Sequence, residues 1–271
     1  MFFRAFIMQH EDLVQVVFYA VILVSLWLTE KFIGALSPGQ KLSRTLLNGR
    51  FIFTALPIQL ALTIFVIMIV KWVTLHHWGL INFVPFHHNL WINYIVLFIL
   101  MDLGEYLYHV TMHKLDPLWR FHLVHHSDLH VDVSTTLREH PVETGIRTCF
   151  LMLWVFLFGA GIAVLMIRQV FQSLFNILAH TEFRLPKRFA TVLGWVFITP
   201  NLHHVHHHHE LPYTDRNYGD VLSIWDRLFG TYSELDPEQT KFGIDTHLDP
   251  NINARFANIL LMPFKPLNRK H

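Results

Sequence analysis

The chain has 271 residues and a formal net charge of +1 at neutral pH. Hydrophobic residues make up 52% of it and charged residues only 15%, a balance that excludes an ordinary soluble domain and indicates a membrane protein. The small net charge gives no polyanion-binding signal, so no nucleic-acid partner is expected. The single cysteine, Cys149, excludes an internal disulfide, and the lack of a CxxC pair excludes a thiolate zinc ribbon.

Three long apolar runs in the first part of the chain predict membrane-spanning helices. The first covers residues 13–28 and continues to residue 33, which is too long for the core of a signal peptide. The second, residues 51–70, has about the 20 residues that a helix needs to cross a bilayer. The third covers residues 91–109 and is interrupted by only two acidic residues.

Basic residues predict the orientation of these helices. The loop between the first two runs carries Lys31, Lys41, Arg44 and Arg50, whereas the loop between the second and third carries only Lys71. By the positive-inside tendency, the first of these loops is cytoplasmic. The third run then returns to the cytoplasmic side and brings the histidines at its end there.

A further apolar stretch, residues 146–179, is interrupted by glycines at positions 159 and 161. Each half is shorter than a comfortable span, and the first, residues 146–158, has 13 residues that give only about 20 Å of helix. We therefore expect a helical hairpin that turns at the glycines and reaches only partway into the bilayer, with Arg168 facing protein or water. The predicted fold is an all-α integral membrane protein with three spanning helices plus this hairpin, and with a histidine-rich helical region on the cytoplasmic side.

Histidines dominate the centre of the sequence, where 14 of the 21 lie between residues 109 and 209. Many are spaced by three or four residues, and on a helix these offsets place side chains on one face. Neutral imidazole is a common ligand of iron, zinc and copper, so the clusters predict a shared metal site. The clusters are His109 with His113, His122 with His125 and His126, and His203 with His206 and His207.

Two acidic residues share a stripe of the third run with the first histidine pair. Asp102 and Glu105 precede His109 at helical spacings, and charged residues inside a span are costly and usually functional. Glu105 is one turn before His109, so we expect it to accept the proton of that ligand's second ring nitrogen. An ion pair or a water contact inside the bundle is the alternative for both acids.

The order and spacing of these clusters resemble the fatty acid hydroxylase superfamily, also called the sterol desaturase family, of membrane di-iron oxygenases. The matching segments are FHLVHHS, LREHPVE, AHTEFRLP, TPNLHHVHH and DRNYGDVLSIWDRLFGTY. The resemblance covers residues 102–232, nearly half of the chain. It implies N-terminal membrane helices over residues 1–90, a di-iron domain over residues 91–232 and a C-terminal tail over residues 233–271.

Carried over position by position, the resemblance implies that nine histidines bind two iron ions. Asn176, one turn before His180, is expected to hold a water on one metal. His140 and Glu143 are expected to interact with the ligand histidines without binding metal themselves. The nine ligands would be His109, His113, His122, His125, His126, His180, His203, His206 and His207.

The last histidine cluster departs from the family pattern. His208 and His209 stand where the family commonly has a serine and a variable residue. A frame that starts at His204 has the same shape as one that starts at His203. Pro200 and the distance to the Asn-Tyr-Gly segment favour His203.

The resemblance implies an enzyme that activates O2 and hydroxylates a C–H bond of a lipid, either fatty acyl, sterol or related. No dinucleotide-binding glycine motif or spare haem ligand set is present, so we expect an external electron donor of the ferredoxin, cytochrome b5 or reductase type. The basic residues Arg184, Lys187 and Arg188 could dock such a donor, or simply flank the membrane.

Two other functions remain open at this point. A desaturase could use the same site. A membrane metal transporter or storage protein belongs to a different class, but would be expected to place its histidines along a path near mid-membrane. Oxygen-dependent product formation distinguishes these classes.

Overall fold

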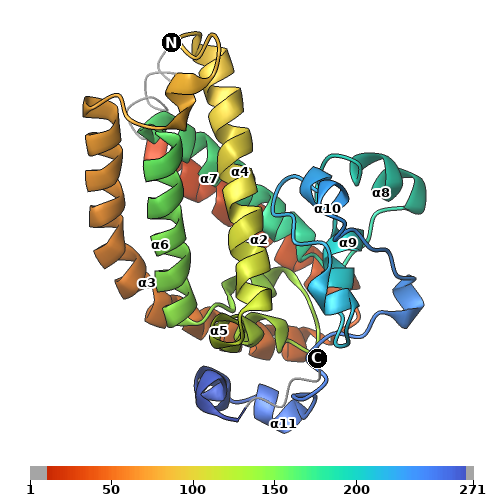
Figure 1. Ribbon diagram of the computed structural model, residues 1–271. Helices are drawn as coiled ribbons and strands as arrows, with labels where there is room; N and C mark the ends of the chain where they lie inside the picture. Colours follow the sequence, from red (N-terminus) through yellow and green to blue (C-terminus); the bar gives the residue numbers. More distant parts are fainter. Residues whose placement is uncertain (1–10, 267–271) are drawn as a thin grey trace, which may run out of the picture.

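A computed structural model describes residues 11–266, and every regular element in that range is a helix, as the sequence predicts (Figure 1). The long helices are α2 Glu11–Ile33, α3 Pro38–Leu75, α4 Leu90–Lys114, α6 Pro141–Phe158 and α7 Ile162–Ala179. The shorter α-helices are α5 Asp116–His126, α8 Lys187–Leu193, α9 Pro200–His206, α10 Ile224–Leu228, α11 Pro250–Asn253 and α12 Phe256–Leu260. Single 3-10 turns are η1 Leu80–Phe83, η2 Val133–Leu137, η3 Tyr213–Asp215, η4 Pro237–Gln239 and η5 Met262–Phe264.

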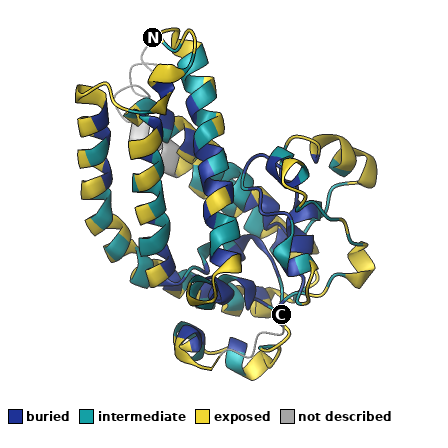
Figure 2. Cartoon of the chain, in the orientation of Figure 1, coloured by how far each residue is buried: buried dark blue, intermediate teal, exposed yellow. Residues whose placement is uncertain are grey.

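Four helical segments within the described residues are long and apolar enough to cross a membrane. They are α4, α6, α7 and the stretch Pro38–Phe83, which contains α3. α3 packs along α6, and α4 packs against α6 and α7, around a core that includes Val70, Leu97 and Val155. The outer faces of α3 and α6 carry many exposed residues (Figure 2), and large apolar side chains are prominent among them. Such a surface suits contact with lipid.

α6 and α7 form the predicted helical hairpin, which turns at Gly159. This residue has a φ of 79°, and a Cβ built on it would lie 2.2 Å from the carbonyl oxygen of Trp78, so the turn requires glycine. The first limb is longer than expected, because α6 already begins at Pro141, and each limb has 18 residues. Such a helix is about 27 Å long. By length and composition each limb can cross a membrane, so the length argument for a hairpin that reaches only partway no longer holds.

Charged residues between the helices are paired. Lys41 is fully buried, with its Nζ 2.5 Å from Glu30 and 3.0 Å from Asp132, and it joins α2, α3 and the segment before η2. Arg168 faces protein, 2.6 Å from Glu105. A buried charge is tolerated when it is paired in this way. The pairs therefore fix how the helices meet near the histidine-bearing end.

The C-terminal helices pack against α5 at that end of the bundle (Figure 1). Trp119 and Leu123 of α5 share a core with Phe51 of α3, Ile259 of α12 and Met262. This core holds α5 across the end of the bundle, where its histidines face those of α4.

Candidate metal centre

Helix ends bring the histidines together. α4 ends at Lys114, and α5 begins almost at once with Pro117 in its first turn, where the missing N–H of proline is harmless. The chain therefore changes direction between the first two clusters. α9 begins at Pro200 and is capped by Thr199, whose side chain accepts a hydrogen bond from the backbone N–H of Leu202. These local signals place all three clusters at the same end of the bundle.

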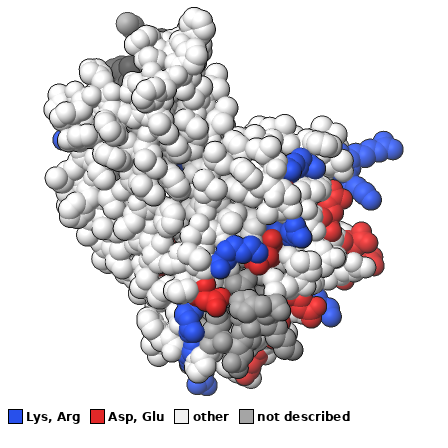
Figure 3. All heavy atoms as spheres, in the orientation of Figure 1, with Lys and Arg blue, Asp and Glu red and all other residues white. Residues whose placement is uncertain are grey.

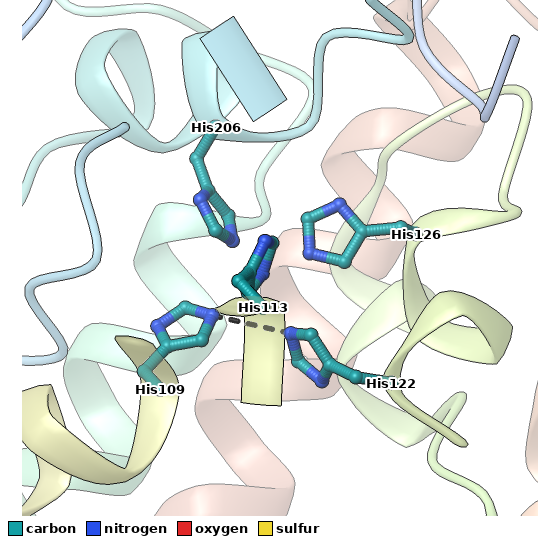
Figure 4. A group of neighbouring side chains, drawn as sticks. All are labelled: His109, His113, His122, His126 and His206. Carbon is teal, nitrogen blue, oxygen red and sulfur yellow. Dashed lines mark hydrogen bonds between the residues drawn. The ribbon is translucent and has the colours of Figure 1, made fainter. Parts of the chain in front are cut away.

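Five histidines from α4, α5 and α9 form the first group, which we call the five-histidine group (Figure 4). One nitrogen of each lies within 4.8 Å of the others, and the rings point toward a common centre. The Nε2 atoms of His109 and His122 are 3.2 Å apart. The members are His109, His113, His122, His126 and His206.

Four further histidines form the second group, the four-histidine group, with one nitrogen of each again within 4.8 Å of the others. Its members are His125, His180, His203 and His207. The Nε2 atom of His180 lies 3.1 Å from that of His125 and 3.0 Å from that of His203. The rings of His126 and His207, one from each group, stack with centroids 4.5 Å apart. The two groups are therefore neighbours.

The geometry fits a metal ion in each group. Two metal–nitrogen bonds of about 2.1 Å at a right angle place the nitrogens about 3.0 Å apart, close to the separations of the Nε2 atoms. Both ring nitrogens of His126 and the Nε2 atom of His206 are buried and have no hydrogen-bond partner. Buried polar atoms are normally satisfied, so these orphaned nitrogens indicate a ligand that the protein atoms do not provide.

The opposite nitrogen of several imidazoles donates a hydrogen bond outward. An acceptor at Nδ1 keeps the proton there and leaves the lone pair of Nε2 directed into the group. The carboxylate of Glu143 accepts from His122 at 2.6 Å. Backbone carbonyl oxygens accept from the others, namely Asn176 from His180 at 2.7 Å, Arg216 from His206 at 2.8 Å and Tyr218 from His109 at 2.9 Å.

Burial keeps the imidazoles outside the spanning helices neutral. It lowers the pKa of His180 to about 4 and that of His206 to about 3. Burial likewise holds the pKa of His125, His126 and His207 well below the usual range. At neutral pH these side chains are in the form that binds metals.

Two of the acids expected to support the ligands have other partners. Glu105 does not accept from His109, whose Nδ1 donates to the carbonyl of Tyr218. The Glu105 carboxylate binds Arg147 at 3.0 Å and Arg168 at 2.6 Å. Asp102 accepts hydrogen bonds from the indole of Trp225 at 2.8 Å and from two backbone N–H groups. Asp102, Glu105 and His109 do lie on one helix, α4, but residues of other helices supply the partners of both acids. Glu105 therefore forms an ion pair inside the bundle, which was the alternative expectation for this residue.

The three remaining expected residues lie in different places. Glu143 binds His122, as described above. His140 caps α6, where its Nδ1 accepts from the N–H of Val142 and its Nε2 donates to the carbonyl of Leu260, so both ring nitrogens have partners outside the two groups. Asn176 accepts from His180 through its backbone carbonyl, and it lines the cavity beside the four-histidine group.

The alternative frame of the last cluster is disfavoured by the contacts of His204. Its Nδ1 accepts from Arg184 at 3.0 Å and its Nε2 donates to the carbonyl of Thr181 at 2.9 Å, so neither nitrogen is available. His208 similarly accepts from the backbone N–H of Lys241. His203 rather than His204 faces the other histidines.

One partner of the five-histidine group was not expected from the sequence. Asp215 lies 3.2 Å from the Nδ1 atom of His113, and it also pairs with Lys114 at 2.7 Å. It is the first residue of the segment DRNYGDVLSIWDRLFGTY. The match of that segment was the available signal, but the sequence alone did not give Asp215 a role.

A cavity of about 60 Å³ touches both groups, and its lining includes His109, His125 and Asn176. A groove of about 600 Å³ lies beside it, between α2, α3, α6 and α7. The residues that line both are Glu105, Thr136, Glu139, Arg147 and Asn176. The cavity at the candidate metal centre and the groove therefore adjoin at these residues.

Comparison with known proteins places these features in a known context. The fatty acid hydroxylase family model matches residues 94–231, about half of the chain. An ornithine lipid hydroxylase of Rhizobium tropici is 30% identical over 173 residues, which are 64% of this chain and 50% of that protein.

Alkylglycerol monooxygenases are also similar. The protein of Danio rerio is 34% identical over 144 residues, covering 53% of this chain and 30% of its own length. That of Homo sapiens is 31% identical over 154 residues, covering 55% and 32%. The chain thus spans half or less of the length of these relatives. No solved structure matches it.

Proposed function

The chain belongs to the fatty acid hydroxylase family, and from this premise we propose that it is a membrane-bound lipid hydroxylase that uses O2 and two non-haem iron ions. The observation that carries the proposal is the pair of buried histidine groups at one end of an apolar helix bundle. Imidazole suits iron, and the bundle gives an apolar substrate direct access from the bilayer.

Each histidine group would hold one iron. When bound, the two irons would supply the reductive activation of O2 that breaking an unactivated C–H bond requires. The chain itself holds the ligands rigidly on helix ends and excludes bulk water by burial. The acceptors behind the Nδ1 atoms, including Glu143 behind His122, orient the rings and raise their basicity.

We assign different tasks to the two sides of the cavity. The four-histidine group has one ligand fewer than its neighbour and lies beside Asn176, whose side chain we propose holds a water there. The lipid would enter through the groove between α2, α3, α6 and α7 and present a carbon to the cavity. Glu105 holds Arg147 and Arg168 where the groove meets the cavity.

The relatives support a lipid as the substrate class. Their names mention an ornithine lipid and alkylglycerols, and both are lipids. We extend this class, and not the particular substrates, to the present chain. Electrons would come from a separate ferredoxin, cytochrome b5 or reductase. The basic loop between the first two helices favours a site on the cytoplasmic side.

The proposal is tested with membranes that contain the full chain, supplied with a reductant under 18O2. Mass spectrometry of the lipids should reveal a product that has gained one 18O atom. His206→Ala should abolish the product, whereas His209→Ala, beside the same helix but outside both groups, should retain it. Absence of any labelled lipid from the unsubstituted protein, loaded with iron, would refute the hydroxylase.

The same experiment separates the two alternatives. A desaturase would give a lipid that has lost two hydrogens and gained no 18O. A metal transporter or storage protein would give no oxygen-dependent product, and metal uptake into vesicles would continue without O2.

A further inference from the structure

A second apolar surface lies outside the four candidate spanning helices, on the part of the molecule that carries α8 and α10 (Figure 1). Its large side chains are between 44% and 70% exposed. We call it the α8–α10 surface, and it consists of Phe189, Val192, Leu193, Trp195, Val196, Leu228 and Phe229. An exposed apolar patch of this kind marks a contact with protein or membrane.

The α8–α10 surface rests on a fixed backbone. Ser223 donates from its N–H to the carbonyl of Val196 at 2.9 Å and from its hydroxyl to the carbonyl of Gly194 at 2.7 Å. Arg227 donates to the same carbonyl of Gly194 at 3.0 Å, and its guanidinium lies 4.0 Å from the ring centroid of Trp195. These bonds join the segment after α8 to α10, so the apolar side chains are presented by a defined structure.

The surface continues onto α2 and onto α7, one of the four candidate spanning helices. An apolar pocket of about 480 Å³ lies between α2, α7 and the segment around α8, and Leu193 lines it together with Leu26, Phe175 and Leu178. Figure 3 shows the same continuity on one face of the molecule, where an uncharged surface extends from the bundle onto the neighbouring lobe. Charged side chains gather along the outer edge and the lower part of that lobe.

Basic residues border the surface. Lys187 and Arg188 are exposed at the start of α8, and Arg227 lies over Trp195. Aromatic and aliphatic side chains bordered by lysine and arginine are typical of segments that lie in the membrane interface, where the cations reach anionic headgroups.

We propose that the α8–α10 surface is inserted into the interface of the bilayer leaflet at the histidine-bearing end, as a membrane contact separate from the spanning helices. Its apolar side chains enter the acyl boundary, and Lys187, Arg188 and Arg227 contact anionic headgroups. Continuity with α2 and α7 favours a bilayer over a soluble partner or a second copy of the chain. The basic residues at α8 then face lipid, not an electron donor.

The test uses spin labels on the full chain in phosphatidylcholine nanodiscs that also contain phosphatidylglycerol. Cys149, the single cysteine, is replaced by serine, and cysteines are introduced one at a time as Val192→Cys, Leu228→Cys and Glu238→Cys. Oxygen concentrates in the bilayer and a charged nickel complex in water. We expect labels at Val192 and Leu228 to collide more with oxygen, and a label at the exposed Glu238 to collide more with nickel.

Greater accessibility to nickel at Val192 and Leu228 would overturn the proposal, as would low accessibility to both reagents with dipolar broadening, which indicates a second copy. A charge-reversed variant, Lys187→Glu with Arg188→Glu, tests the headgroup contact. It should lower the oxygen-to-nickel ratio at Val192 in anionic nanodiscs and leave it unchanged in pure phosphatidylcholine. An unchanged ratio in both would overturn that contact. These measurements need no turnover, so they stand apart from the proposed hydroxylase activity.

Discussion

The two histidine groups differ in the acceptors of their Nδ1 atoms, the ring nitrogens that point away from the group. In the five-histidine group, Glu143 lies behind His122 and Asp215 behind His113. In the four-histidine group, the described acceptors are backbone carbonyls, such as that of Asn176 behind His180. A carboxylate strengthens an imidazole as a ligand and offsets the charge of a bound cation. The comparison suggests one closed and strongly held metal, and a second that is more open toward the cavity.

The sharpest way to separate the two metals is to remove one ligand from each group. His126→Ala and His207→Ala delete rings that stack on each other but belong to different groups. Each variant should lose one of two metals, as measured by elemental analysis of the purified protein, and its turnover should fall below detection. The reason is that the proposed chemistry needs both irons.

The control for this pair is His209→Ala, which removes a ring outside both groups. It should keep two metals per chain. Full metal content in either His126→Ala or His207→Ala would mean that the groups are not separate binding sites. Loss of both metals from one variant would mean that they fill cooperatively.

Acidification should lower the free energy of unfolding of the metal-free protein through buried histidines of both groups. Burial lowers the pKa of His180 to about 4 and that of His206 to about 3, below the ordinary value of about 6.5. Above pH 6.5 neither the folded nor the unfolded state holds these protons. Below it the unfolded chain binds protons that the folded chain excludes. For each such histidine, the free energy of unfolding then falls by up to about 1.4 kcal/mol per pH unit, down to the folded-state pKa.

The measurement is the thermal midpoint of the metal-free protein in detergent, between pH 7.5 and pH 4.5. The midpoint should change little above pH 6.5 and fall steadily below it. His180→Gln should show a shallower fall, because one titrating group is gone. A midpoint that is independent of pH over the acid range would contradict the buried, neutral state of the rings.

The contrast between the groups also explains what the sequence could predict. Histidine spacing predicted that the three clusters meet at one site, because side chains at helical offsets share a face. It did not predict His180, which came from the family resemblance, or that His125 belongs to a different group from His122 and His126. It could not predict most of the acceptors behind the rings, because those of Tyr218 and Arg216 are backbone carbonyls, which leave no side-chain signal. Glu105 has the right spacing for His109, but Arg147 and Arg168 approach it from other helices.

The same limit applies to the hairpin. The predicted first limb was too short because only apolar residues were counted, whereas the helix begins with polar residues that face the protein interior. Glu143 and Thr144 are buried within α6. Helix boundaries follow caps as well as hydrophobicity, and here His140 is the N-cap. Pro141 at the following position was the sequence signal for this start.

Neutralising the stronger carboxylate should affect the five-histidine group alone. Glu143→Gln keeps the shape of the side chain but removes the charge behind His122, so we expect metal affinity in that group to fall by about 10- to 100-fold. Competition with a chelator measures this loss. Tyr108→Phe, which removes only the 3.2 Å hydrogen bond to the same carboxylate, should have a smaller effect. Equal weakening of both metals would remove the distinction between the groups.

The smallest effect is expected at Asp215. Its contact with His113 is 3.2 Å, against 2.6 Å for Glu143 and His122, and it shares its charge with Lys114. Asp215→Asn should therefore weaken the same metal by less than Glu143→Gln does, at or below about tenfold. Lys114→Ala should raise the affinity for this metal slightly, because the carboxylate of Asp215 then interacts with His113 alone. Chelator competition on the two variants, in parallel with Glu143→Gln, measures the metal affinity of each. A smaller loss of affinity in Asp215→Asn would mean that the distance between carboxylate and imidazole sets how tightly this metal is held. Equal losses in Asp215→Asn and Glu143→Gln would mean that any carboxylate partner has the same effect, whatever its distance.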